Sequence, residues 1–319
     1  MTNFDVFNGD ADGICSLVQL RLAEPKSSVL VTGVKRDIEL LQRVEAQSGD
    51  QVVVLDISMD KNMTALMELL DKEVNVVYAD HHQSGIIPNH KTLQAYIDTS
   101  ANTCTALIVN QSLNNQYAEW AVTAAFGDNL FESAYQLATK IGLDEVDTDR
   151  LKTLGTYLNY NGYGASLDDL LIHPALLYQH LVKYASPLAF LEDTTALFSQ
   201  LESGFLHDMN LAASLKPVHC DEHTAAYILP NQKWARRVSG VYSNNLANNF
   251  PDRAHAVLTE KFNNHYLVSV RAPLNNKQGA DELVSKFATG GGRKAAAGIN
   301  ELPKTQLSEF LNQFKQQFC

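Results

Sequence analysis

Long apolar runs and cysteine-rich patterns are both absent from this sequence of 319 residues. No apolar stretch approaches the 18 or more residues that a membrane-spanning helix requires, so we expect no association with membranes. The N-terminus lacks the basic and apolar segments of a signal peptide. The four cysteines are widely scattered and form no CxxC pair, a usage that excludes a disulfide-rich secreted fold. We therefore expect a cytoplasmic protein.

Basic residues are also few, with 25 lysines and arginines against 36 aspartates and glutamates and a formal net charge of −11. This balance excludes a protein that coats duplex DNA or long RNA by general attraction to phosphates. The negative net charge still allows binding of a short nucleotide by a few arginines beside a metal ion. The carboxylates that bind such an ion are neutralised by its charge. The hydrophobic content of 45% is that of an ordinary globular protein.

The first part of the chain alternates between apolar strand patterns and amphipathic helix patterns. Strand patterns fall at 4–7, 28–34, 52–55 and 74–79, and helix patterns at 14–22, 38–44 and 63–70. The run at 52–55 (VVVL) is typical of a strand buried on both faces. This alternation predicts an α/β fold with a parallel sheet covered by helices, in which ligands gather beyond the carboxyl ends of the strands.

The composition changes along the chain and predicts a second, smaller α/β domain. Residues 102–205 are mostly helical in pattern, with a break expected at 159–166. Strand and turn patterns begin near residue 225, and the chain ends in an amphipathic helix. We predict a first domain, a helical connector and a second domain at 1–185, 186–214 and 215–319.

Acidic and imidazole residues directly follow three of the predicted strands. They are Asp10 and Asp12, then Asp56, then Asp80, His81 and His82. Asp128 follows an apolar helix pattern and is a further candidate. Hard divalent cations prefer oxygen ligands, imidazole suits manganese, and a two-metal phosphoryl-transfer site needs a bridging carboxylate. The pattern predicts a divalent metal site at this edge of the sheet.

Each of these residues also has a simpler interpretation when taken alone. Asp10 and Asp12 could form a turn and cap a helix, and Asp56 could cap the end of a strand. A histidine pair is common on protein surfaces. Burying several carboxylates together without a metal ion would cost several kcal/mol for each of them, and their conjunction therefore favours the metal site.

Several segments resemble the motifs of the DHH phosphoesterases, in the order in which that family has them. The N-terminal ones are residues 10–13 (DADG), 55–58 (LDIS), 80–82 (DHH) and 125–129 (AFGDN). Residues 269–271 (SVR) and 290–298 (GGGRKAAAG) resemble the C-terminal domain that accompanies the family. The resemblance therefore covers nearly the whole chain. It implies that residues 1–185 form a metal-binding catalytic domain, that 215–319 form a substrate-binding domain, and that the active site lies in the cleft between them.

The resemblance implies a role for each candidate residue. The metal ligands would be Asp10, Asp12, Asp56, His81 and Asp128, with Asp56 bridging two manganese ions, and magnesium is an alternative ion. His82 would contact the scissile phosphate, and Asp80 would orient the neighbouring histidine. Substrate would also be bound by Arg271, Gly290, Gly291, Gly292 and Arg293. The implied reaction is in-line attack by a metal-activated water molecule.

Three positions depart from the family pattern. Val6 stands where many members have a histidine ligand, and Asn8 stands where RecJ-type members have an aspartate. Arg293 replaces the usual histidine of the glycine motif. Because fewer charged ligands bind an ion more weakly, we expect one tight and one weak manganese site.

The family resemblance implies a hydrolase that acts on phosphodiester bonds of short oligonucleotides or dinucleotides. The alternatives within the family are a RecJ-like single-strand exonuclease and a phosphatase acting on nucleoside bisphosphates or polyphosphate. A different class, a catalytically weak nucleotide-binding sensor, is favoured by Val6 and Asn8. We expect a short nucleotide or another phosphate ester as the binding partner, without stable binding to duplex DNA, and we allow for a homodimer.

Overall fold

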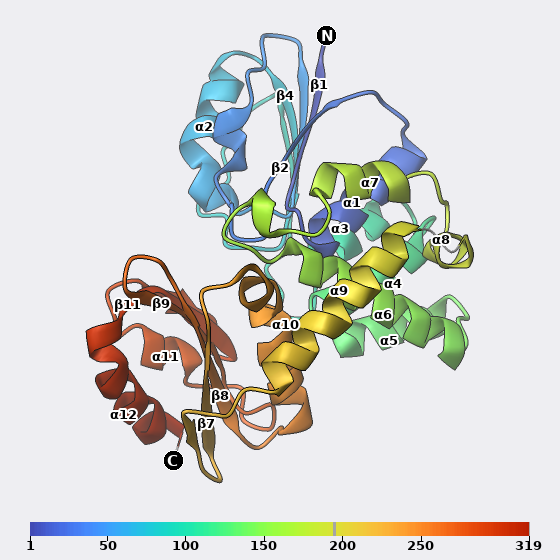
Figure 1. Cartoon of the computed structure of the whole chain (residues 1–319). Coiled ribbons are helices and arrows are strands. Elements are labelled where there is room, and N and C mark those ends of the chain that lie inside the picture. Colours follow the sequence, from blue (N-terminus) through green and yellow to red (C-terminus); the bar gives the residue numbers. More distant parts are fainter. Residues whose placement is uncertain (194–195, 319) are drawn as a thin grey trace. The chain divides into compact units, whose positions relative to one another are not determined.

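The computed structural model describes residues 1–193 and 196–318 and divides into two compact units, Met1–Glu202 and Ser203–Cys319 (Figure 1). Helix α9 (Ala196–Ala213) contains the boundary and lies within the segment predicted as the connector. No helix among the described residues is both long enough and apolar enough to cross a bilayer.

The first unit is built on a five-stranded sheet in the order β2-β1-β3-β4-β5, and every neighbouring pair of strands is parallel. The strands are β1 (Asn3–Phe7), β2 (Val29–Thr32), β3 (Gln51–Leu55), β4 (Asn75–Asp80) and β5 (Leu93–Ile97). The predicted parallel sheet is confirmed. The edge strand β5 was not predicted, because its residues are all partly or fully exposed and its sequence, LQAYI, is no continuous apolar run.

Helices and short 3₁₀ turns connect the strands and then form the rest of the first unit. They are α1 (Ala11–Ala23), η1 (Leu40–Arg43), α2 (Met59–Asp71), α3 (Thr105–Ser112), α4 (Ala118–Gly127), α5 (Phe131–Lys140), α6 (Glu145–Gly162), η2 (Leu167–Asp169), α7 (Pro174–Leu181) and α8 (Pro187–Glu192).

The helix predicted at 38–44 is wrong, because the chain forms only the short turn η1 there. The side-chain oxygen of Asn62 accepts from the backbone N–H of Leu41 at 3.2 Å, and its amide donates to the carbonyl of Ile38 at 2.6 Å. These backbone groups are therefore bound by a side chain of α2 instead of by a helical neighbour.

The helix break predicted at 159–166 begins too early, because α6 continues to Gly162. Asparagine favours turns when its amide binds the local backbone. The Asn161 amide instead donates to the carbonyl of Ile172 at 2.8 Å and accepts from its N–H at 3.0 Å. This tertiary contact leaves the helix backbone intact to its last turn.

One face of the parallel sheet forms a hydrophobic core beneath α2 and η1 (Figure 1). Alternate strand residues such as Val6, Val54 and Tyr78 are fully buried there and pack in one cluster with Leu66 of α2. Burial of these side chains stabilises the sheet whose strand ends carry the candidate site.

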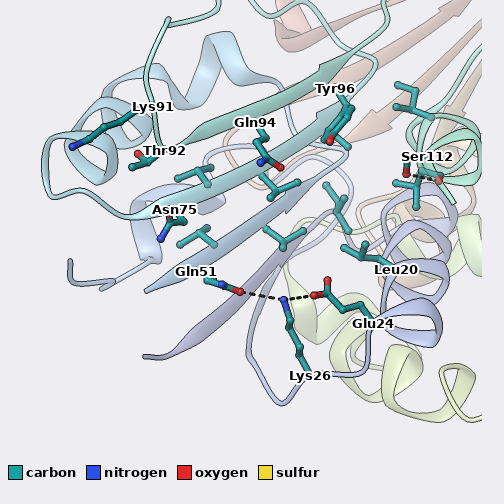
Figure 2. A pocket seen from close by; sticks show the side chains of 18 residues that line it. Leu20, Glu24, Lys26, Gln51, Asn75, Lys91, Thr92, Gln94, Tyr96 and Ser112 are labelled. Atoms are coloured by element: carbon teal, nitrogen blue, oxygen red, sulfur yellow. Dashed lines mark hydrogen bonds and ion pairs between the residues drawn. The ribbon is translucent and has the colours of Figure 1, made fainter. Parts of the chain in front are cut away.

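The opposite face of the sheet is partly covered by α1 and α3 and contains a cavity of about 530 Å³ (Figure 2). Its apolar floor includes Val53 and Val77, and its rim carries polar side chains such as Lys26, Gln94 and Lys91. None of the predicted metal ligands, all of which lie in the described part of the chain, lines this cavity.

The second unit contains a mixed six-stranded sheet in the order β10-β11-β9-β8-β7-β6. Its elements are β6 (His219–Cys220), β7 (Thr224–Leu229), α10 (Lys233–Asn249), β8 (Ala254–Glu260), β9 (His265–Arg271), α11 (Ala280–Val284), β10 (Gly290–Gly292), β11 (Ala296–Pro303), η3 (Lys304–Gln306) and α12 (Leu307–Phe318). Strands β7 and β8 are parallel, and α10 supplies the crossover that such a pair requires. The predicted second α/β domain is confirmed, although α10 was not foreseen.

Candidate metal centre

Three neighbouring parallel strands bring the candidate residues to one edge of the first sheet. The register pairs Phe7 of β1 with Leu55 of β3, and Leu55 with Ala79 of β4. The residues that follow these positions therefore leave the sheet side by side. The candidate centre is built on these three strand ends and on the helices α1, α3 and α4.

Asp56 leaves β3 in a left-handed backbone conformation, with φ of 59°. A residue other than glycine is strained there, and such strain is concentrated at functional sites. The side chain is 2% exposed, and one carboxylate oxygen accepts a hydrogen bond from the Thr105 hydroxyl at 3.3 Å. The strained backbone directs this carboxylate toward the other candidates.

Asp10 and Asp12 lie at the start of α1 and are 1% and 0% exposed. Asp10 caps the helix and accepts from the backbone N–H groups of Asp12 and Gly13, both at 3.1 Å. Asp12 accepts from the N–H groups of Thr105 and Ala106, at 2.8 and 2.7 Å, at the start of α3. The simple capping interpretation thus holds for Asp10, while Asp12 binds the positive end of another helix.

His81 presents one ring nitrogen to three carboxylates. Its Nδ1 lies 3.0 Å from the carbonyl oxygen of Thr103, so Nδ1 carries the proton and Nε2 is left as a lone-pair donor. Nε2 lies 3.9 Å from Asp12, 3.5 Å from Asp56 and 3.6 Å from Asp128. A carbonyl that fixes the tautomer in this way is typical of a metal-binding histidine.

His82 is held by the acidic residue that precedes the histidine pair. Its Nδ1 lies 2.7 Å from Asp80 Oδ1 and 3.8 Å from Asp56 Oδ1. Asp80 is fully buried, whereas 39% of the His82 side chain is exposed. Asp80 therefore orients the imidazole of His82, which is partly exposed to solvent beside Asp56.

Two sets of donor atoms in the described residues lie close enough together to hold an ion. Asp56, His81 and His82 form one set, and Asp12, His81 and Asp128 form the other, with all donor atoms of a set within 4.8 Å of one another. His81 belongs to both sets. We call Asp12, Asp56, His81 and Asp128 the His81 group; its oxygen and imidazole donors fit a divalent ion such as manganese.

Burial and mutual repulsion shift the ionisation of these carboxyl groups. Burial, followed by the charges of neighbouring aspartates, raises the pKa of Asp56 well above its usual value and also raises that of Asp12. Burial alone would also raise the pKa of Asp128, but Lys35 and the two histidines lower it. A divalent cation would favour the charged form of all three.

Lys35 is a component of the centre that the sequence analysis missed. Its ammonium group binds a carboxylate oxygen of Asp10, Asp128 Oδ1 at 3.0 Å and Asn159 Oδ1 at 3.1 Å. Burial alone would lower the pKa of Lys35, but the charges of Asp10 and Asp128 raise it well above its usual value. We call Asp10, Lys35 and Asn159, with Asp128 Oδ1, the Lys35 group.

Asp128 and Asn159 are brought together by close packing of α4 against α6. Asp128 caps the C-terminal end of α4, and Asn159 lies in the last turn of α6. A Cβ on Gly155 would lie 2.1 Å from the Thr123 carbonyl oxygen, and one on Gly127 would lie 2.9 Å from the Gly155 carbonyl oxygen. Only glycine permits this approach at both positions.

Apart from His82, the predicted substrate-binding residues lie in the second unit. Arg271 ends β9 and donates to Asn244 Oδ1 at 2.8 Å. Arg293 is exposed in the turn between β10 and β11, where its backbone bonds to Ala296, the residue that pairs with Arg271. The two arginines therefore lie at the same end of this sheet.

The three glycines form strand β10, and two of them are required by geometry. A Cβ on Gly290 would lie 1.7 Å from the carbonyl oxygen of Val284, whereas one on Gly291 would meet no atom within 4 Å. Gly292 has a φ of 148°, a conformation that other residues rarely adopt. The triplet is therefore an ordered strand beside the Arg293 turn.

Acidic and imidazole donors at the carboxyl ends of a parallel sheet define this chain as an α/β protein with a candidate divalent-metal centre. Residues 5–133 match the family model described as "DHH family, N-terminal domain". This match contains all the predicted metal ligands. Residues 5–133 therefore carry the N-terminal domain of the DHH family, as the motifs in this part of the sequence predicted.

Solved structures show the same fold over 99% of this chain. A DHH-domain protein described as a member of a family of ribosomal proteins is 14% identical, with a TM-score of 0.64 over 86% of its length. Exonuclease RecJ bound to manganese is 16% identical, with a TM-score of 0.60 over 89% of its length. The pGpG-specific phosphodiesterase PggH from Vibrio cholerae is 13% identical, with a TM-score of 0.61 over 100% of its length. No curated protein matches the chain.

Proposed function

We propose that this protein is a metal-dependent phosphoesterase that hydrolyses phosphodiester bonds of short oligonucleotides or dinucleotides. The observation that carries the proposal is the His81 group, in which one imidazole nitrogen lies within 3.9 Å of three separate carboxylates. The family match and the likeness in fold to an exonuclease and a dinucleotide phosphodiesterase support the same class of reaction.

The His81 group would hold the ion, and manganese suits it better than magnesium because one of its donors is an imidazole. When bound, such an ion polarises a phosphoryl oxygen and lowers the pKa of a water molecule. His82, oriented by Asp80 and partly exposed, would contact the scissile phosphate. Asp56 lies next to both histidines and would orient the attacking water.

The second unit would bind the substrate through Arg271, Arg293 and the strand Gly290–Gly292. The planar guanidinium group suits bidentate binding of phosphate oxygens. Gly291, where an added Cβ would meet no atom within 4 Å, leaves room for a phosphate to approach the backbone. The low number of basic residues in the chain favours short substrates over long strands. A cytoplasmic location and a homodimer stay predictions from the sequence.

The test is a comparison of hydrolysis rates with Mn²⁺ and with a chelator. The substrates are dinucleotides, longer single strands, nucleoside bisphosphates and polyphosphate. We expect Mn²⁺-dependent release of nucleoside monophosphates, fastest from dinucleotides. Fastest turnover of long strands would favour the exonuclease alternative, and fastest turnover of bisphosphates or polyphosphate would favour a phosphatase. Nucleotide binding without any turnover would contradict the proposal and favour a sensor.

A further inference from the structure

The predicted metal ligands divide between two side chains in this structure, His81 and Lys35. Asp12 and Asp56 face His81 Nε2, whereas Asp10 binds Lys35. Asp128 serves both sides, with Oδ2 at 3.6 Å from His81 Nε2 and Oδ1 at 3.0 Å from Lys35 Nζ. The ammonium group of Lys35 thus already binds the oxygens that an ion next to Asp10 would need as ligands.

The position of Lys35 is fixed by its backbone as well as by its side chain. Its N–H donates to the Gly162 carbonyl at 2.7 Å, and its carbonyl accepts from the Asn8 amide at 3.2 Å. An ammonium group has three donors, and three oxygens accept from it, on Asp10, Asp128 and Asn159. All three donors of the ammonium group are therefore bound, and two backbone hydrogen bonds hold Lys35 in place.

The donors that remain around Asp10 do not suit a divalent ion. Asp10 Oδ1 already accepts from two backbone N–H groups of α1, and Oδ2 binds Lys35. Val6 is apolar and fully buried in the core, and Asn8 offers at most a neutral amide oxygen. An ion beside Asp10 would therefore have fewer free charged donors than an ion in the His81 group, which offers three carboxylates and an imidazole.

Charge balance leads to the same conclusion. Asp10, Asp12, Asp56 and Asp128 carry at most four negative charges between them. One divalent ion and Lys35 supply three positive charges, which these carboxylates can neutralise. A second divalent ion beside Lys35 would raise the positive charge of the centre to five and would repel the ammonium group at close range.

We propose that Lys35 takes the place of a second metal ion, so that the centre binds a single divalent ion in the His81 group beside a resident ammonium group. This replaces the weak second manganese site expected from the sequence. The number of ions does not depend on the proposed function. One further step does rest on it, namely that Lys35, whose side chain is 24% exposed, contacts a phosphoryl oxygen of the substrate.

The decisive experiment counts Mn²⁺ ions bound to the full-length chain without substrate, by isothermal titration calorimetry and by metal analysis after desalting. We expect one ion per wild-type chain and two per Lys35→Ala chain, because this change frees Asp10, Asp128 and Asn159. Lys35→Arg keeps the positive charge and should still bind one ion. Lys26→Ala, which removes a lysine outside the centre, is the matched control and should also bind one.

Electron paramagnetic resonance gives an independent reading of the same samples. Loaded wild-type protein should show the signal of isolated Mn²⁺, and Lys35→Ala should show spin coupling between two ions. Two ions on the wild-type chain would overturn the proposal, even if Lys35→Ala failed to fold. An unchanged count of one on folded Lys35→Ala, verified by circular dichroism, would also overturn it.

Turnover separates this proposal from the proposed function. If both are right, Lys35→Ala should lower kcat/KM by about 100-fold while binding Mn²⁺ at least as tightly as the wild type. A wild-type protein that binds one ion but hydrolyses no phosphodiester would contradict the proposed function and leave the single-ion centre standing. A wild-type protein that hydrolyses phosphodiesters but binds two ions would support the proposed function and contradict the single-ion centre.

Discussion

The two units of this chain treat buried polar groups in opposite ways. The first unit gathers four carboxylates, none more than 2% exposed, at one edge of its sheet: Asp10, Asp12, Asp56 and Asp80. The second unit buries His255 within its sheet, and neither ring nitrogen has a hydrogen-bond partner among the described residues. Its buried Asp208 is paired with Arg237.

This difference indicates what each unit is built to do. Buried charges that repel one another cost stability, and a site retains them only when a cation or a substrate uses them. Buried groups that are neutral or paired cost less and require no ligand. The first unit therefore has the features of a site that binds a cation or a substrate, whereas these buried groups of the second unit require no ligand.

The largest effect should come from Asp56→Asn in the first unit. We expect kcat/KM to fall by about 100- to 10,000-fold, because the charge next to both histidines is lost. Asparagine tolerates the left-handed backbone, so the fold should remain. Steady-state kinetics with Mn²⁺ measure the loss, and Asp71→Asn, an exposed change at the end of α2, is the control. A variant with more than about a tenth of the wild-type rate would remove Asp56 from the reaction.

In the second unit, Gly290→Ala should strongly reduce stability without changing Mn²⁺ affinity. The new Cβ would lie 1.7 Å from a backbone carbonyl, so we expect a loss of at least about 3 kcal/mol in the free energy of unfolding. Gly291→Ala meets no atom within 4 Å and is the matched control. Urea denaturation measures both. Equal stability of the two variants would contradict the close packing of β10.

Stability of the second unit should also depend on pH through His255. Burial, followed by the charge of Arg253, lowers the pKa of His255 from 6.5 to about 4 in the folded protein. Between these values the unfolded chain binds more protons than the folded chain, so the free energy of unfolding rises with pH. Neutral His255 makes its full contribution to the free energy of unfolding above pH 6.5. This contribution, on the order of 3 kcal/mol, is lost as the pH falls toward 4.

Urea denaturation of wild-type protein and His255→Leu across this pH range measures the effect. The variant should lose less stability between pH 6.5 and pH 4 than the wild type. His223→Leu changes an exposed histidine of the same unit and is the control. Identical pH profiles for wild type and His255→Leu would show that His255 is protonated without cost in the folded state.

The smallest effect should come from Arg293→Ala. We expect KM for a dinucleotide to rise by about tenfold, which corresponds to one charge-assisted contact with phosphate. Mn²⁺ affinity and stability should not change, because the side chain is exposed. Calorimetry and kinetics measure the two quantities separately. A change in Mn²⁺ binding, or an unchanged KM, would remove Arg293 from the substrate site.

The sequence predicted the parallel sheet and the family because both depend on local patterns. Strand periodicity located the turns that carry Asp10, Asp56 and His81, and the parallel connections brought these turns to one edge. Lys35 was missed because only acidic and imidazole residues were considered, although it also follows a strand that ends at that edge. Asn159 was missed because a tertiary contact, and not local pattern, keeps α6 helical there.

The second sheet shows a similar limit. The turn between β8 and β9 is a local feature of the predicted strand and turn pattern, and its residue Asn264 has a φ of 59°. Helix α10 was missed because its sequence is rich in serine and asparagine, which favour turns in isolation. The parallel pairing of β7 with β8 requires this helix, and that pairing is a long-range feature that no local window contains.

The glycine contact between α4 and α6 has a consequence for how the centre can vary. Asp128 and Asn159 both depend on that one contact and both accept from Lys35, and Asp128 also faces His81. A single methyl group at Gly155 would widen the spacing of the helices and shift both oxygens relative to the sheet, while Asp12 and Asp56 stayed in place. The distance between Lys35 and the His81 group thus depends on the packing of a helix pair, and a substitution in that pair could change it without changing any residue of either group.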